Sequence, residues 1–237
     1  VQFTPGIYYA GFFAKEVSWP NQISVSYKDS VVTSDKMEDN TIKIWDIDNG
    51  RLLKTLEGHK GEVNGIQLTE NERKLISCSQ DGSIKIWDMA TGKLLKTFEA
   101  HKGEIYAIQL TKDEKKLISC SWDGTIKIWE MGNGKLHKIL EGHKHNVSGI
   151  QLTKNEKKLI SYARDKTINI WDLENFKLIK TLEGHTDIIS GVQLTKDEKK
   201  LICYSWDSTI RVWDMKDGKL LKTLTEHYQG VKEIQLT

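Results

Sequence analysis

The same residue types return at intervals of 42 residues along most of the chain. Three markers keep this interval without an insertion: Trp45, Trp87, Trp129, Trp171 and Trp213; His59, His101, His143, His185 and His227; Asp39, Asp81, Asp123, Asp165 and Asp207. Independently placed core residues would not share one register in this way. The sequence therefore predicts a chain built from one repeated structural unit.

Each unit contains four short apolar segments separated by polar or glycine-bearing turns. In residues 101–140 these segments are 105–110, 117–121, 125–129 and 136–140, and they are rich in β-branched and aromatic residues. Their length and composition predict strands. The Asp-Gly pair between the second and third segments predicts a type I′ hairpin turn, in which both central residues have positive φ. We therefore expect a four-stranded antiparallel sheet in each unit.

One such sheet cannot bury both of its faces, whereas copies stacked around an axis can, which predicts an all-β propeller of four-stranded antiparallel blades. The sequence pairs Gly58-His59, Asp81-Gly82 and Trp87-Asp88 resemble the signature of the Trp-Asp (WD) repeat β-propeller family. The resemblance implies a propeller over residues 31–237. Residues 1–30 are expected to form a divergent N-terminal segment, either a strand packing on the propeller or a docking segment.

The resemblance also implies a hydrogen-bonded chain inside each blade, formed by a histidine, the turn aspartate, a serine and a tryptophan. Three complete sets occur: His59, Ser77, Asp81 and Trp87; His101, Ser119, Asp123 and Trp129; His143, Ser161, Asp165 and Trp171. In the following unit Cys203 takes the place of the serine between His185, Asp207 and Trp213. Because a thiol is a weak hydrogen-bonding group, we expect a weaker network there.

The first and last units leave three arrangements open. In the first, a strand at 231–236 completes the first sheet, His227 faces Asp39 and Trp45, and a five-bladed ring closes. In the second, residues 1–30 contribute to a sixth, partial blade. In the third, the chain is an open fragment of a larger six- or seven-bladed ring, because it stops inside a repeat.

The charge balance limits the class of partner. The 35 Lys and Arg residues face 33 Asp and Glu residues, which leaves a net charge of +2. This balance disfavours non-specific binding to nucleic acid, so the Lys-rich turns at 112–116, 154–158 and 196–200 are interpreted as a solvated bottom face. A nucleic-acid contact through these turns is the alternative. No apolar run is long enough to predict a membrane span.

Cys78, Cys120 and Cys203 form no Cys-x-x-Cys pair, and each lies in a short apolar run. They are expected to be buried thiols in a reducing compartment, the cytoplasm or the nucleus. The repeated histidines fall once per blade and so do not converge on one metal ion. No phosphate-binding glycine loop, nucleophile elbow or His-Glu-x-x-His motif is present, and we expect no enzyme activity, metal or cofactor.

Function is expected where the units differ while the scaffold stays constant. The resemblance places three sets of variable positions on the top rim: Gln80, Trp122, Arg164 and Trp206 before the turn aspartate; Asn64, Tyr106, Ser148, Ser190 and Lys232 at the start of the first strand; Glu62 and Glu104 two residues earlier. Tryptophan, tyrosine and arginine are typical of binding hot spots. These residues favour a protein- or peptide-binding scaffold within a larger assembly.

The expected ligand is a peptide that carries Lys or Arg, since a cation can lie on an aromatic face. Two other interpretations stay open. Trp122 and Trp206 could pack between adjacent blades without binding anything, or the repeats could have a purely structural role with no discrete ligand site.

Overall fold

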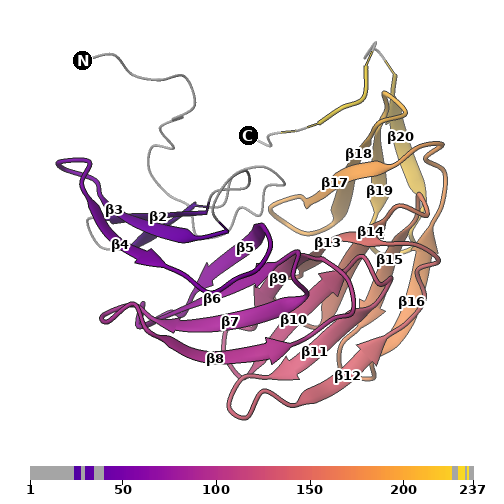
Figure 1. Ribbon diagram of the computed structural model, residues 1–237. Helices are drawn as coiled ribbons and strands as arrows, with labels where there is room; N and C mark the ends of the chain where they lie inside the picture. Colours follow the sequence, from indigo (N-terminus) through magenta and orange to yellow (C-terminus); the bar gives the residue numbers. More distant parts are fainter. Residues whose placement is uncertain (1–23, 28–29, 35–39, 226–228, 233, 235–237) are drawn as a thin grey trace.

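The computed structural model describes residues 24–27, 30–34, 40–225, 229–232 and 234 (Figure 1). The predicted network residues Asp39 and His227 lie outside the described residues, as does most of the predicted N-terminal segment. The described part of the chain contains strands and turns and no helix.

Twenty strands form five antiparallel sheets of four, each in simple sequence order. We number the sheets as blades 1 to 5. Blade 1 contains β1 (Ser24–Tyr27), β2 (Ser30–Ser34), β3 (Ile42–Asp46) and β4 (Leu52–Leu56); blade 2 contains β5 (Val63–Leu68), β6 (Lys74–Ser79), β7 (Ser83–Asp88) and β8 (Leu94–Glu99); blade 3 contains β9 (Ile105–Leu110), β10 (Lys116–Ser121), β11 (Ile126–Glu130) and β12 (Leu136–Leu140).

Blade 4 contains β13 (Val147–Leu152), β14 (Lys158–Ala163), β15 (Ile168–Asp172) and β16 (Lys177–Leu182); blade 5 contains β17 (Ile189–Leu194), β18 (Lys200–Ser205), β19 (Ile210–Asp214) and β20 (Leu220–Leu224). The blades follow one another in an arc, with β5, β9, β13 and β17 toward the inside and β8, β12, β16 and β20 toward the outside (Figure 1). The predicted all-β propeller architecture is confirmed.

The core lies between the blades. Four clusters of buried apolar residues each join two consecutive blades, and Ile118 and Ile126 of blade 3, for example, pack with Leu159 and Trp171 of blade 4. Because alternate residues of a strand point to opposite faces of its sheet, each of blades 2 to 4 contributes one apolar face to the cluster before it and one to the cluster after it. Cys78, Cys120 and Cys203 are buried in these clusters, and none of the three forms a disulfide.

In the described residues, blade 1 is completed by a strand from the start of the chain and not by one from its end, as the closed five-bladed ring requires. Its inner strand is β1, which pairs antiparallel with β2. This strand lies within residues 1–30, for which the sequence predicts either a divergent strand or a docking segment. Val231 instead donates its backbone N–H to the carbonyl of Ser205 in blade 5, and neither Val231 nor Lys232 belongs to a strand.

The hairpin between the second and third strands of a blade lies where predicted but does not have the type I′ geometry. In blade 2 the loop is formed by Gln80, Asp81 and Gly82, and the Gly82 N–H donates to the Ser79 carbonyl at 3.2 Å. Gly82 has a φ of 77°, whereas Asp81 is not among the residues with positive φ. The prediction of a type I′ turn was therefore wrong. A three-residue loop that ends in a left-handed residue is the other common hairpin connection, and it exposes its first residue.

Candidate functional site

The predicted chain of polar side chains runs through blades 2, 3 and 4. In blade 2, His59 Nδ1 lies 3.0 Å from Asp81 Oδ2, and His59 Nε2 lies 2.7 Å from Ser77 Oγ. Trp87 Nε1–H donates to the same Ser77 Oγ at 2.8 Å. The equivalent atoms are within 2.7 to 3.0 Å in the sets His101, Asp123, Ser119 and Trp129, and His143, Asp165, Ser161 and Trp171.

One arrangement of protons satisfies every bond in blade 2. The Trp87 indole can only donate, so the Ser77 oxygen accepts from it and the Ser77 hydroxyl hydrogen goes to His59 Nε2. The proton of the neutral imidazole is then on Nδ1, where it donates to Asp81. The network is thus a closed set of bonds within one blade. It links the top loop to the buried strands.

The ionisation of these groups agrees with that arrangement. Burial alone would raise the pKa of Asp81, but hydrogen bonds from His59, the Lys60 backbone and Ser83 lower that pKa well below its usual range. The pKa of Asp123 and of Asp165 is lowered in the same way. Burial lowers the pKa of His101, although its bond to Asp123 opposes the shift. In blade 3, these shifts favour a neutral His101 imidazole beside an ionised Asp123 carboxylate.

Blades 5 and 1 depart from the common pattern. In blade 5, Cys203 Sγ lies 2.9 Å from His185 Nε2 and accepts from Trp213 Nε1 at 3.1 Å, while His185 Nδ1 lies 2.8 Å from Asp207. Burial raises the pKa of the Cys203 thiol to about 12, so it stays protonated.

In blade 1, Trp45 Nε1 donates to Thr33 Oγ1 at 2.9 Å. Thr33 is a network residue that the sequence reasoning missed. It lies 12 residues before Trp45, whereas the serines of the other blades lie 10 residues before their tryptophan. An alignment that allowed for the extra residues in the first unit would have found it.

The variable residues gather at one end of the blades, which we call the top face. The first residue of each three-residue loop donates its backbone N–H to the carbonyl of the residue before strands β5, β9, β13 or β17. The pairs are Gln80 to Glu62, Trp122 to Glu104, Arg164 to Asn146 and Trp206 to Ile188, at 2.8 to 3.0 Å. The predicted rim residues of each blade are thereby held next to one another.

Trp122 is the centre of the most developed contact on this face. Its ring stacks on Tyr106 with centroids 6.3 Å apart, and the guanidinium carbon of Arg164, from the next blade, lies 5.3 Å from its centroid. Even so, Trp122 is 45% exposed and Trp206 is 57% exposed. Neither tryptophan is therefore buried between blades.

The other predicted rim residues have smaller roles. Gln80 donates from Nε2 to Glu62 at 2.8 Å, and Asn64 donates from Nδ2 to the carbonyl of Ile105 at 3.0 Å. Ser148 and Ser190 are partly buried, and Lys232 is exposed. The Ser190 Oγ is buried without a hydrogen-bond partner.

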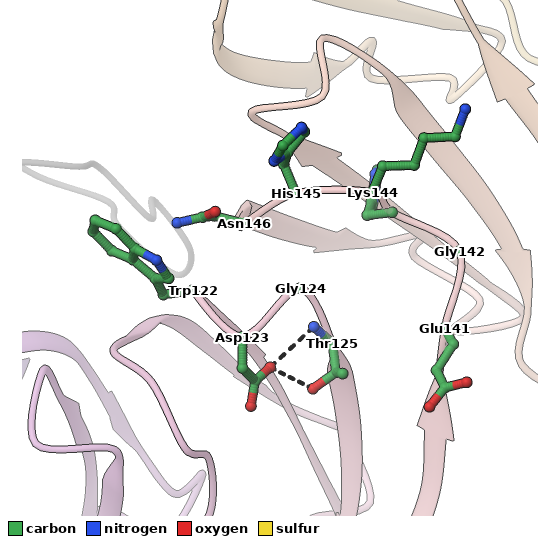
Figure 2. A pocket seen from close by; sticks show the side chains of 10 residues that line it. Trp122, Asp123, Gly124, Thr125, Glu141, Gly142, Lys144, His145 and Asn146 are labelled. Atoms are coloured by element: carbon green, nitrogen blue, oxygen red, sulfur yellow. Dashed lines mark hydrogen bonds between the residues drawn. The ribbon is translucent and has the colours of Figure 1, made fainter.

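A hollow of about 360 Å³ opens beside Trp122, between blades 3 and 4 (Figure 2). The side chain of Asn146 points toward Trp122, and Asp123 bonds to Thr125. The lining residues come from two loops: Trp122, Asp123, Gly124 and Thr125; Glu141, Gly142, His143, Lys144, His145 and Asn146.

At the hollow, blades 3 and 4 lack a pair of backbone hydrogen bonds that joins blades 2 and 3. Between blades 2 and 3, the N–H groups of Ala100 and His101 both donate to the Gly82 carbonyl at 3.0 Å. Among the described residues, no such bond joins Gly124 to Gly142 or His143. The loop before blade 4 thus lacks these backbone bonds to the hairpin of blade 3, and the hollow lies between the two.

The Lys-rich turns lie at the opposite end of the blades and join one blade to the next. The Nζ of Lys112 donates to the carbonyl of Lys154 at 2.6 Å, and the Nζ of Lys154 donates to the carbonyl of Lys196 at 2.5 Å. Glu156 Oε1 accepts the Lys112 N–H, and Glu198 Oε1 accepts the Lys154 N–H. The sequence reasoning missed these glutamates, although they recur at the 42-residue interval.

Two further classes of site are absent from the described ranges. These residues contain no group of three or more His, Cys, Asp or Glu side chains arranged to hold a metal ion. Nor do they form any helix long and apolar enough to cross a membrane.

Comparison with curated proteins gives no match for this chain. A family model, described as WD domain, G-beta repeat, matches residues 50–88, 92–130, 134–172 and 176–214. Each match begins at or near the turn before the outer strand of one blade and ends at the Trp-Asp or Trp-Glu pair of the next blade. The four matches end in blades 2, 3, 4 and 5. Together with the five four-stranded blades, they show that the chain belongs to the WD-repeat family.

Proposed function

We propose that this protein is a non-catalytic scaffold that binds a protein or peptide on its top face, within a larger assembly. The observation that carries the proposal is Trp122, a large aromatic side chain that stays exposed at the edge of a hollow while Tyr106 and Arg164 contact its ring. Binding energy concentrates in such aromatic and arginine side chains when a partner removes them from water.

Preorganisation strengthens this interpretation. A side chain already held by its neighbours loses little rotamer entropy when a partner covers it. Trp122 and Arg164 belong to adjacent blades, and the backbone N–H of each donates to the residue before the inner strand of its own blade. The site is thus supported by rigid sheets.

The cation expected on the Trp122 face is supplied by the protein itself. Arg164 takes the position over that ring that a ligand Lys or Arg would need. Trp206 is the remaining exposed tryptophan of the rim, so a basic ligand side chain is expected there, with another part of the peptide in the hollow beside Trp122.

The bottom face favours the scaffold over the nucleic-acid alternative. Lys112 and Lys154 use their ammonium groups to hold neighbouring turns, and Glu156 and Glu198 lie among them. A nucleic-acid surface needs cations that are free to neutralise phosphates.

Selection of binders from a displayed peptide library tests the proposal. Peptides that bind the wild-type chain are expected to bind a Trp122→Ala, Trp206→Ala variant at least about tenfold more weakly, since each tryptophan is a candidate hot spot. A Leu53→Ala, Leu95→Ala variant, changed at two exposed positions on outer strands, serves as the matched control. Peptides that bind all three proteins equally would contradict the proposal.

A further inference from the structure

The four interfaces between blades are copies of one design. Each blade offers a trailing face, made of an isoleucine from its second strand, two residues from its third and one from its fourth. The next blade covers this trailing face with its own leading face. The leading face is made of a leucine from the second strand, the repeat tryptophan and the residue two positions after that tryptophan. Between blades 3 and 4, the trailing face is Ile118, Ile126, Ile128 and Leu140, and the leading face is Leu159, Trp171 and Leu173.

The trailing face of blade 5 is uncovered. Leu224 is 48% exposed, whereas its equivalents Leu56, Phe98, Leu140 and Leu182 are 1%, 6%, 2% and 3% exposed. Ile202, Ile210 and Val212 complete this face and are only partly buried, unlike Ile160, Ile168 and Ile170 of blade 4.

The leading face of blade 1 is uncovered as well. Ile47 is 55% exposed, whereas Met89, its equivalent in blade 2, is fully buried against blade 1. Val31 and Trp45 complete the face and are partly buried, while Trp87 is almost fully buried. The same chain therefore displays both halves of an interface that it forms four times internally.

At two of the internal interfaces, a lysine of one blade donates to a backbone carbonyl of the next blade, and the two ends of the arc carry the corresponding groups. Lys54 on β4 donates its ammonium group to the backbone carbonyl of Met89 at 2.7 Å, and Lys180 on β16 donates to that of Asp217. Lys222 on β20 is the equivalent lysine of blade 5, and it is exposed. Both acceptors lie in the turn between the third and fourth strands, which in blade 1 is formed by residues 47–51.

We infer that the trailing face of blade 5 binds the leading face of blade 1 in a second copy of this chain. The apolar residues match those of the internal interfaces, and Lys222 corresponds in the repeat to Lys54 and Lys180. In Figure 1 the two faces lie at opposite ends of the arc. Joining them within one chain would require all four packed interfaces to tilt, whereas association between copies changes none of them. Such a head-to-tail contact continues until a ring closes or a chain of copies forms.

Sedimentation velocity of the full chain over a range of concentrations tests the inference. We expect a concentration-dependent rise in mass beyond the monomer. Leu224→Asp and Ile47→Asp are each expected to weaken association at least about tenfold, because each places a charge in an apolar interface. Leu221→Asp is the matched control: Leu221 lies on the same strand, and its equivalents Leu53, Leu95 and Ile179 are exposed in other blades.

Mixing the two variants separates head-to-tail association from a symmetric contact. The Leu224→Asp chain keeps its leading face and the Ile47→Asp chain keeps its trailing face, so the mixture is expected to form a dimer of one copy of each and nothing larger. A wild-type chain that stays monomeric at every concentration would overturn the inference. So would association that survives both variants, or variants that fail to combine on mixing.

Discussion

Arg164 lies across Trp122, with its guanidinium carbon 5.3 Å from the centre of the indole ring, although the two residues belong to adjacent blades. The 42-residue repeat places one variable residue at the same corner of each blade, and stacking of the blades brings these corners together. The contact between Arg164 and Trp122, a proposed binding residue, thus joins two positions that have no relationship within one repeat.

The arrangement of Arg164 and Trp122 predicts a spectroscopic effect. Labelling with 5-fluorotryptophan gives one ¹⁹F signal for each of the eight tryptophans, and Trp122→Phe identifies the signal of Trp122. We expect Arg164→Gln to shift and broaden this signal while changing the free energy of unfolding by less than about 1 kcal/mol, because the pair is partly exposed. An unchanged Trp122 signal would mean that the arginine does not restrain the ring.

Ser77 connects Trp87 and His59, so its loss is expected to be costly. Ser77→Ala leaves the indole N–H and His59 Nε2 buried without partners and should lower the free energy of unfolding by about 1 to 3 kcal/mol. Urea denaturation followed by circular dichroism measures this loss. Ser77→Cys keeps a weak partner and should lose less. Equal losses for the two variants would contradict the hydrogen-bonded role of Ser77.

Blade 5 offers the reverse experiment. Cys203 occupies the place of the serine, with its sulfur 2.9 Å from His185 and 3.1 Å from the Trp213 nitrogen. Cys203→Ser restores the stronger partner found in blades 2 to 4 and should raise the free energy of unfolding by about 1 kcal/mol. A loss of stability on this change would show that packing of the larger sulfur outweighs hydrogen bonding at this position.

The ionisable groups of the networks predict a fall in stability with acid. Burial lowers the pKa of His101 and His185 in the folded state, so their neutral forms stabilise the fold above the unfolded pKa of about 6.5, and this contribution falls as the pH drops below it. Burial would raise the pKa of Asp207, but its hydrogen bonds from Thr209, Thr186 and His185 lower it to about 2.

The aspartates therefore stabilise the fold above their unfolded pKa of about 3.9, and this contribution is lost as the pH falls toward 2. Urea denaturation at a series of pH values should show a constant free energy of unfolding above pH 7, a first decline below about 6.5 and a second below about 4. Stability that increased on acidification would show that the histidines are charged in the folded protein.

The scaffold could be predicted from the sequence because it depends on residues at fixed separations. His59, Ser77, Asp81 and Trp87 are placed by one short sheet, and the interval between repeats carries the same geometry to the next blade. Two local features were not predicted: Thr33 as the hydrogen-bond partner of Trp45, and a hairpin loop in which Gly82 has a positive φ and Asp81 does not.

Contacts between blades could not be predicted in the same way. The carboxylates of Glu156 and Glu198 reach the turn of the preceding blade, and nothing within one repeat distinguishes them from solvated charges. At the hollow beside Trp122, the backbone of the loop at Gly142 does not bond to the preceding hairpin, whereas that of Ala100 does. Such differences arise only when the blades are stacked.

The most direct test of the central claim is affinity purification with mass spectrometry, which compares three forms of the full chain. These are the wild type, the Trp122→Ala, Trp206→Ala variant and the Leu53→Ala, Leu95→Ala control, each checked by circular dichroism for intact β-structure. We expect a set of partners common to the wild type and the control and absent from the tryptophan variant. Recovery of the same partners with all three forms would contradict binding through the top face.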